Sequence, residues 1–251
     1  MLASAPPTCH LDVLGSASVR AVVDGRSFLL EDGREIRLAG IEVPLPPLPG
    51  ETGARAEAGA SARAALQQML AGQAVELRHE LPAADRYGRI LAQAYFTTDG
   101  KEKSAAHEMV AAGFARVSAR VGGMGCATAL LAREREARQR KVGLWADAYY
   151  SIVGTENHAG LVARRGQFTV AEGKVVTVRE SGGTIYVNFG RRWSDSLTVT
   201  IAKRNERMFA AAGVPPASLA NLRVRVRGWI EDRNGPRIEA MRPEQIEIAE
   251  R

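Results

Sequence analysis

Charged side chains gather at the predicted ends of strands in the first third of the chain. Asp24 lies in a tight turn, Arg37 and Glu42 lie on or just after a predicted strand over residues 36–41, and Arg89 directly precedes another predicted strand. Carboxylate oxygens are ligands for a hard cation, and guanidinium groups form paired hydrogen bonds with phosphate. These residue types at this spacing indicate phosphodiester chemistry.

The elements that must position these side chains follow from the hydrophobic pattern and from the Gly and Pro turns. Strands are predicted at 13–24, 27–30, 36–41, 75–78 and 90–96, and helices at 54–71, 104–112 and 127–140. Five strands with helices packed on them predict a mainly β fold with some α, built on a five-stranded Greek-key barrel.

Three stretches, at residues 22–28, 37–44 and 85–89, occur in an order that resembles the staphylococcal nuclease (thermonuclease) family. The resemblance extends over residues 19 to 146. It implies a nuclease-type oligonucleotide-binding (OB) barrel and a calcium ion that assists hydrolysis of DNA or RNA.

The metal-binding residues of the family are matched only in part. Asp24 matches the first aspartate of the acidic motif, but Arg26 stands where the family has a metal ligand. Glu42 matches the strand-end metal ligand and could still serve. Leu45 stands where the family has the glutamate that acts on the attacking water, and it can neither accept a proton nor orient water. Calcium binding is therefore doubtful, although Glu51 on the same loop offers another carboxylate.

The phosphate-binding residues of the family are better preserved. Arg37 and Arg89 match its two phosphate arginines, and Tyr87 matches a tyrosine beside the nucleotide, whereas Ala119 replaces a second tyrosine. A structural alternative remains open, in which either arginine pairs with a neighbouring carboxylate, Glu42 or Asp85, and Tyr87 belongs to the core.

A second all-β pattern follows in the chain. Strands are predicted at 168–178, 184–189, 197–201, 224–230 and 238–241, with a helix at 203–212 after the third strand. This is the arrangement of a second, smaller OB-like barrel. We therefore expect an N-terminal arm (1–18), a nuclease-like domain (19–147), a linker (148–166) and an OB-like domain (167–251).

The second domain holds most of the net positive charge. Residues 154–251 contain sixteen basic and eleven acidic residues, out of a net charge of +6 for the chain. Arg191, Arg192 and Trp193 lie together, and Lys203 and Arg204 follow, so aromatic stacking and phosphate neutralisation predict single-stranded DNA or RNA, or another polyanion, as the partner. The alternative is that Trp193 belongs to the core. A further stripe of arginines at 223, 225 and 227 could face nucleic acid or solvent.

The two cysteines, Cys9 and Cys126, are too few for a structural zinc site and are either inert thiols or one disulfide. The resemblance to exported family members favours the disulfide. Residues 1–7 resemble a start placed after a removed export signal, so we expect an exported or periplasmic protein whose signal peptide is absent from this chain. No apolar run is long enough to span a membrane.

Three functions agree with these patterns. The first is a nucleic-acid-binding protein on a nuclease scaffold, with weak or absent phosphodiesterase activity. The second is an active metal-dependent endonuclease, and the third is an exported structural or protein-interaction module with a protein partner.

Overall fold

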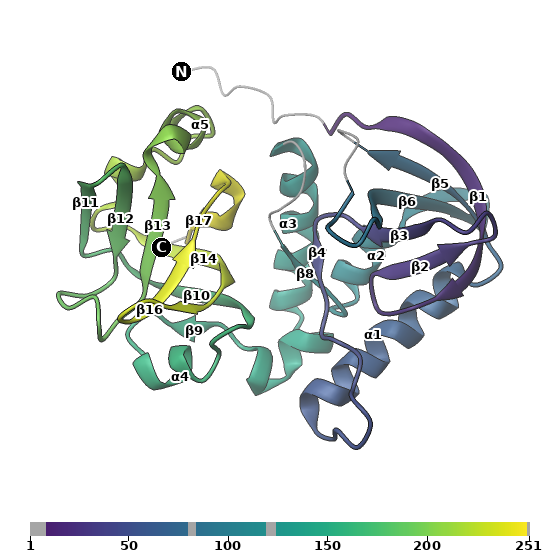
Figure 1. Cartoon of the computed structure of the whole chain (residues 1–251), viewed down its shortest axis with the longest axis horizontal. Helices are drawn as coiled ribbons and strands as arrows, with labels where there is room; N and C mark the ends of the chain where they lie inside the picture. Colours follow the sequence, from purple (N-terminus) through teal and green to yellow (C-terminus); the bar gives the residue numbers. More distant parts are fainter. Residues whose placement is uncertain (1–8, 80–83, 119–123, 250–251) are drawn as a thin grey trace. The chain divides into compact units, whose positions relative to one another are not determined.

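The computed structural model describes residues 9–79, 84–118 and 124–249 and shows two compact units, Met1–Tyr150 (unit 1) and Ser151–Arg251 (unit 2) (Figure 1). Within these described ranges no helix combines the length and the apolar character needed to cross a membrane. Residues 1–7, which resemble a start placed after a removed export signal, lie outside the described residues.

The elements of unit 1 follow the predicted order, with additional short strands. Its strands are β1 (Asp12–Val22), β2 (Ser27–Leu30), β3 (Glu35–Leu38), β4 (Ile41–Glu42), β5 (Ala74–His79), β6 (Ile90–Thr98), β7 (Lys101–Ser104) and β8 (Arg116–Val117). Its helices are α1 (Ala54–Leu70), α2 (Ala105–Ala111), α3 (Met124–Gln139) and the 3₁₀ helices η1 (Gly143–Ala146) and η2 (Ala148–Tyr150).

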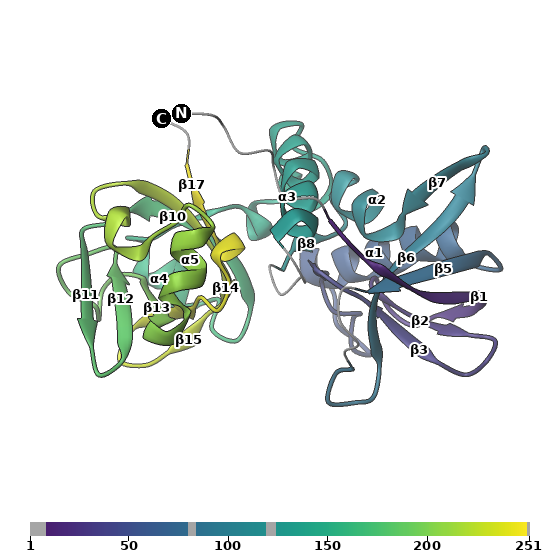
Figure 2. The same ribbon diagram turned by 90° about the horizontal axis from the view of Figure 1, so that it is seen from above.

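Five of these strands close into a barrel. Antiparallel pairs join β2 to β1 and β3, and β5 to β1 and β6, while β3 and β6 pair in parallel through Ile36↔Ile90, Arg37↔Leu91 and Leu38↔Ala92. Figure 2 shows β1, β2, β3, β5 and β6 side by side. The predicted five-stranded barrel of unit 1 is confirmed.

Two predicted limits in unit 1 differ from the structure. The arm predicted at 1–18 overlaps the strand predicted at 13–24, and residues 12–18 belong to the strand, because they pair with β5 as the first half of β1. The predicted strand over residues 36–41 is also interrupted, since Gly40 has a φ of 82° and turns the chain away from the barrel. Glu42 therefore lies on β4, opposite Arg116 of β8.

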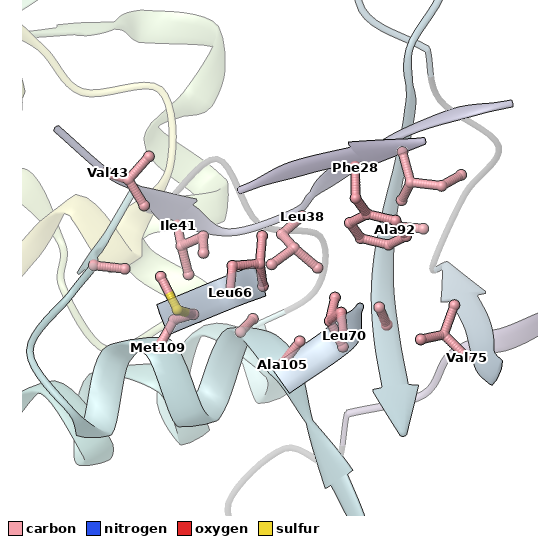
Figure 3. Packing of buried hydrophobic residues seen from close by; sticks show 14 of the residues in the cluster. Phe28, Leu38, Ile41, Val43, Leu66, Leu70, Val75, Ala92, Ala105 and Met109 are labelled. Carbon is pink, nitrogen blue, oxygen red and sulfur yellow. The ribbon is translucent and has the colours of Figure 1, made fainter. Parts of the chain in front are cut away.

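The core of unit 1 fills the space between the barrel and its helices (Figure 3). Phe28 and Leu38 of the barrel, Leu66 and Leu70 of α1, and Met109 of α2 are 0–2% exposed. Each fully buried side chain of this size contributes about 1.5–3 kcal/mol relative to an exposed one. Burial of these side chains therefore holds α1 and α2 against the barrel.

Unit 2 begins earlier than the predicted second domain. Its strands are β9 (Val153–Gly154), β10 (Phe168–Lys174), β11 (Thr177–Ser181), β12 (Thr184–Asn188), β13 (Thr198–Ala202), β14 (Arg223–Trp229), β15 (Glu231–Asp232), β16 (Pro236–Glu239) and β17 (Ile246–Ile248). Its helices are α4 (His158–Val162), α5 (Glu206–Ala211) and the 3₁₀ helices η3 (Lys203–Asn205), η4 (Pro216–Leu219) and η5 (Pro243–Gln245).

Two predictions for unit 2 differ from the structure. Residues 148–166 are not a simple linker, because β9 pairs with β10, and Val153 and Leu161 belong to the hydrophobic core of unit 2. The predicted strand over residues 168–178 is two strands, since β10 and β11 belong to different sheets. The first feature was missed because the hydrophobic periodicity of residues 148–166 is weak.

The strands of unit 2 form two sheets. One has the order β17-β14-β10-β9, and the other has the order β11-β12-β13-β16-β15, in which β13 and β16 run parallel. The α5 helix follows β13 in the chain, as predicted, although its first turn is the 3₁₀ helix η3. That unit 2 is an OB-type barrel stays a prediction.

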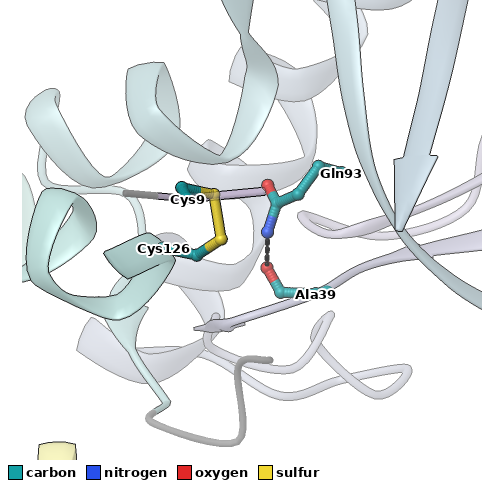
Figure 4. Close-up of a disulfide and its surroundings, with 4 residues drawn as sticks. All are labelled: Cys9, Ala39, Gln93 and Cys126. Atoms are coloured by element: carbon teal, nitrogen blue, oxygen red, sulfur yellow. Dashed lines mark hydrogen bonds between the residues drawn. A yellow bond between two sulfur atoms is a disulfide. The ribbon is translucent and has the colours of Figure 1, made fainter. Parts of the chain in front are cut away.

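A disulfide joins Cys9, just before β1, to Cys126 in the first turn of α3, as predicted (Figure 4). The two cysteines are 117 residues apart in the sequence, and their Cα atoms are 4.5 Å apart. The bond therefore closes a loop that includes the whole barrel of unit 1.

Removing this disulfide should destabilise unit 1. A chain-entropy treatment of so long a loop gives about 3–5 kcal/mol of stabilisation. We expect the double variant Cys9→Ser/Cys126→Ser to unfold at lower urea concentration than the oxidised protein and to be insensitive to reductant. Two free thiols in unreduced, unfolded wild-type protein would contradict the assignment.

Candidate functional site

A buried ion pair joins Arg26 and Glu42, the two residues that stand where the family has metal ligands. Nη1 of Arg26 lies 2.6 Å from Oε2 of Glu42, and these side chains are only 7% and 13% exposed. The same nitrogen donates a hydrogen bond to the carbonyl oxygen of Ile41 at 3.0 Å. The Arg26 guanidinium thus neutralises the carboxylate that matched a metal ligand.

The loop before β2 orients Arg26 toward this carboxylate. Oδ1 of Asp24 accepts a hydrogen bond from the backbone N–H of Arg26 at 2.8 Å. Gly25 packs so closely on α1 that a Cβ there would lie 2.7 Å from Cβ of Ala62. The Asp24 carboxylate therefore acts in the turn itself, and glycine is needed for the turn to fit against α1.

The segment after β3 places Glu42. Nε2 of the buried Gln93 donates a hydrogen bond to the carbonyl oxygen of Ala39 at 2.9 Å (Figure 4). The left-handed Gly40 then turns the chain, and its carbonyl accepts a hydrogen bond from the N–H of Ser118 at 2.9 Å. These contacts direct β4 toward β8 and bring Glu42 to Arg26.

Arg89 is held by a carboxylate of its own turn. Its Nη2 and Nε atoms each lie 2.7 Å from Oδ2 of Asp85. Burial raises the pKa of the Asp85 carboxyl, but hydrogen bonds from the N–H of Tyr87 and from Arg89 outweigh it, so that this pKa is below its usual value. Arg89 adopts the structural pairing that the sequence analysis gave as its alternative.

Tyr87 is not a core residue, because its side chain is 66% exposed. Its ring lies against two guanidinium groups, with the Cζ atoms of Arg86 and Arg89 4.8 and 5.2 Å from the ring centroid. The hydroxyl group also accepts a hydrogen bond from Arg86 at 2.7 Å. The exposed ring is therefore available to contact a ligand beside Arg89.

Arg37 differs from the other two arginines of the site. Among the described residues, no carboxylate oxygen lies within 4.0 Å of its guanidinium group. Burial lowers the pKa of Arg37, and the positive charges of Arg26 and Arg89 lower it further, while the negative charges of Glu42 and Asp24 offset part of this effect. A half-buried cation beside two other cations favours an anion, because an anion would relieve the repulsion.

In the loop after β4, neither Leu45 nor Glu51 is placed to act as a catalytic base. Leu45 is 53% exposed, and its carbonyl oxygen packs against Gly59 of α1, where a Cβ would come within 2.1 Å. The Glu51 carboxylate accepts a hydrogen bond from the N–H of Leu48 at 3.0 Å and lies 3.4 Å from Arg55. Glu51 is thus engaged within its own segment. Ala119 lies outside the described residues.

The basic residues predicted in unit 2 separate into different environments. Arg191 and Trp193 line one groove, Trp193 is 56% exposed rather than in the core, and Arg192 lies on the surface, 3.9 Å from Asp195. Nζ of Lys203 lies 2.6 Å from Glu180 and 2.8 Å from Glu206, and Arg204 is exposed on η3. Neither Lys203 nor Arg204 lines the groove with Trp193.

The arginines of the β14 stripe pair with carboxylates of the neighbouring strands, although Arg223 at its end is exposed. Glu172 of β10 lies 2.7 Å from Arg223 and 2.6 Å from Arg225, while Glu247 of β17 pairs with the fully buried Arg227. Burial raises the pKa of the Glu172 carboxyl, but the two arginines outweigh this effect and lower it. Two of these three positive charges are therefore compensated within the sheet.

The groove lined by Arg191 and Trp193 also contains residues that the sequence analysis missed. It has a volume of about 690 Å³ on the sheet β11-β12-β13-β16-β15, and we call it the unit 2 groove. Its lining includes Thr177, Arg179, Tyr186, Asn188, Arg191 and Trp193. The period-two alternation of β11 and β12 could have shown that Arg179 and Tyr186 project from one face.

The ion pair between Arg26 and Glu42 predicts a non-additive stability effect. Glu42→Gln should lower the free energy of unfolding by about 3–5 kcal/mol, because it leaves a buried guanidinium without its counter-ion. The double variant Arg26→Met/Glu42→Leu should be less destabilised than either single variant with one charge left. Glu35→Gln, which changes a more exposed carboxylate 3.9 Å from Arg89, is the control and should cost at most about 1 kcal/mol. Additive urea-unfolding energies would contradict this coupling.

Comparison with known proteins identifies one part of the chain. Residues 35–147 match the family described as staphylococcal nuclease homologue. Arg37, Glu42, Leu45 and Arg89 lie inside the matched span, and Asp24 and Arg26 precede it. No curated protein matches the chain. The match and the closed barrel of unit 1 together show that this chain carries a domain of the staphylococcal nuclease family.

Proposed function

We propose that this chain binds nucleic acid, or another polyanion, on a nuclease scaffold whose metal site is degenerate, and that its phosphodiesterase activity is weak or absent. The observation that carries the proposal is the buried ion pair between Arg26 and Glu42 at 2.6 Å. It supports loss of the metal site in a domain whose family relationship indicates nuclease ancestry.

The residues at this position do not fit a calcium ion. Calcium takes about 6–8 oxygen ligands, whereas in the described part of the chain no group of three or more His, Cys, Asp or Glu residues could hold a metal. At an effective dielectric constant of about 20, two like unit charges about 4 Å apart repel by about 4 kcal/mol, and a divalent ion doubles this repulsion. Calcium would also have to displace Arg26 from Glu42.

The arginines support binding without a metal. A guanidinium group forms charge-assisted hydrogen bonds with phosphate oxygens without help from a cation. Arg37 has no described carboxylate within ion-pair distance, and the exposed ring of Tyr87 lies beside Arg89. This arrangement favours a bound phosphate group at Arg37.

The disulfide supports the expected compartment. Disulfides form and persist mainly in oxidising compartments, so the bond between Cys9 and Cys126 supports an exported or periplasmic location. An oxidising compartment does not by itself choose between a nucleic-acid-binding protein and a structural module. Measurements of pyrophosphate and oligonucleotide binding distinguish these two functions.

Cleavage of single-stranded DNA and RNA with calcium, with a chelator control, tests the catalytic part of the proposal. We expect the unmodified chain to show no calcium-dependent cleavage above background. The double variant Arg26→Asp/Leu45→Glu should gain it, because the first substitution adds a carboxylate beside Asp24 and Glu42 and the second adds one that could orient water. Brisk calcium-dependent cleavage by the unmodified chain, lost in Arg89→Ala, would instead establish an active nuclease.

Binding of pyrophosphate in the presence of chelator tests the anion site, because this probe has phosphate groups and no base. Arg37→Ala should weaken binding about tenfold or more, since a hydrogen bond to a charged group contributes about 1.5–3 kcal/mol. Arg20→Ala, which removes an exposed arginine of β1, should leave the affinity unchanged. Equal affinities of the Arg37→Ala and wild-type chains in calorimetric titrations would place the anion elsewhere.

A further inference from the structure

We propose that the unit 2 groove is a second binding site, specific for single-stranded nucleic acid, in which Tyr186 and Trp193 stack on bases and Arg179 and Arg191 contact phosphates. The inference rests on the proposed function in that the ligand is nucleic acid, and it assigns base recognition to unit 2. A volume of about 690 Å³ is within the range of ligand sites, about 300–1,000 Å³.

The floor of the unit 2 groove is a row of hydrogen-bonding side chains across three strands. Thr177 of β11, Asn188 of β12 and Thr198 of β13 are direct neighbours in the strand register. Nδ2 of Asn188 donates to Oγ1 of Thr177 at 3.3 Å, and Oγ1 of Thr198 donates to Oδ1 of Asn188 at 3.3 Å. The row gives the floor fixed hydroxyl and amide groups that can bond to base edges or sugars.

A cation and an aromatic ring lie next to this row. Arg179 and Tyr186 are directly opposite each other in the antiparallel pair of β11 and β12. Their neighbours Val178, Ile185 and Val187 belong to or pack against the core. Because side chains alternate along a strand, Arg179 and Tyr186 both project away from the core, and both line the groove.

Two of the arginines in the groove have no carboxylate partner of their own. Arg237 and Arg233 lie 2.8 and 3.6 Å from Glu231, so they share one carboxylate, which compensates one of their two positive charges. For Arg179 and Arg191, no carboxylate oxygen within residues 9–79, 84–118 and 124–249 comes within 4.0 Å. These two exposed guanidinium groups supply most of the uncompensated positive charge of the groove.

The loop that presents Trp193 is anchored by its backbone. A Cβ on Gly235 would lie 2.3 Å from the carbonyl oxygen of Trp193, and a Cβ on Gly190 would lie 2.3 Å from Oγ of Ser196. Oγ of Ser196 also donates a hydrogen bond to the carbonyl oxygen of Arg192 at 3.1 Å. The fold thus fixes the backbone of this loop while Trp193 stays 56% exposed. Little conformational entropy of the loop is therefore lost when a base stacks on the indole ring.

The combination of rings and cations selects the ligand class. A polyanion without bases would need only the arginines, whereas unpaired bases offer flat faces to both Tyr186 and Trp193. In a double helix the base faces are already stacked on each other, so a duplex could use only its phosphates. Single-stranded DNA or RNA therefore fits more of the groove than an acidic peptide, a sulfated glycan or a duplex.

The test measures fluorescence anisotropy of the full chain with single-stranded DNA and RNA of one length, in chelator, over a range of salt concentrations. An abasic oligonucleotide, a duplex and poly-glutamate are the comparison ligands.

Tyr186→Ala and Trp193→Ala should each weaken oligonucleotide binding about tenfold, with Tyr186→Phe and Trp193→Phe close to wild type. Arg179→Ala and Arg191→Ala should each reduce the slope of log affinity against log salt by about 0.7. Arg207→Ala, an exposed arginine of α5 outside the groove, is the charge control, and thermal melting checks the folding of every variant.

Loss of oligonucleotide binding in the groove variants, with pyrophosphate binding at Arg37 intact, would support the second site. If Arg37→Ala abolishes oligonucleotide binding while the groove variants bind normally, the groove proposal is wrong and the proposed function stands. Equal affinity for abasic and normal oligonucleotides, or stronger binding of poly-glutamate, would overturn single-stranded nucleic acid as the ligand. Failure of the wild-type chain to bind any oligonucleotide, with pyrophosphate still bound, would overturn the groove proposal alone, whereas failure to bind either ligand would overturn both proposals.

Discussion

The parallel pairing of β3 with β6 is the constraint on which the geometry of unit 1 depends. It closes the barrel and places Ile36 beside Ile90, so that segments distant in the sequence meet. Ile36 and Leu38 are buried in the core, and alternation along the strand forces Arg37 to the opposite side. Arg89 directly precedes β6 and is brought to the same end of the barrel. The core thus determines which arginines can act together.

Local pairing of charges, rather than net charge, distinguishes the proposed binding surfaces from structural ones in this molecule. The stripe of Arg223, Arg225 and Arg227 is a dense basic pattern of unit 2, yet Glu172 and Glu247 compensate most of its charge. Arg179 and Arg191 are less conspicuous in the sequence, but no described carboxylate neutralises them. An arginine that already compensates a buried carboxylate is costly to redirect, because its partner would be left buried and unpaired.

Much of the fold was predictable because its signals are local. The strand Ser27–Leu30 has the predicted limits, since its apolar run lies between two Asp-Gly turns. The strand Lys101–Ser104 was missed because it is charged, and it forms because Asp99 and Gly100, with φ angles of 51° and 69°, turn the chain back onto β6. The partner of Arg26 was not predictable, because it depends on the turn at Gly40 that redirects Glu42 toward β8.

The two proposed anion sites differ in their physical means of recognition. In unit 1 a buried ion pair joins two residues that match metal ligands of the family, and the remaining cation, Arg37, is half-buried near other cations, which suits a compact phosphate group. In unit 2 the cations are exposed and lie beside aromatic rings on an open sheet face, which suits an extended chain of stacked bases. A guanidinium that binds phosphate without a metal holds it but supplies neither an activated water nor a base. The two proposed sites would therefore retain a polyanion without cleaving it.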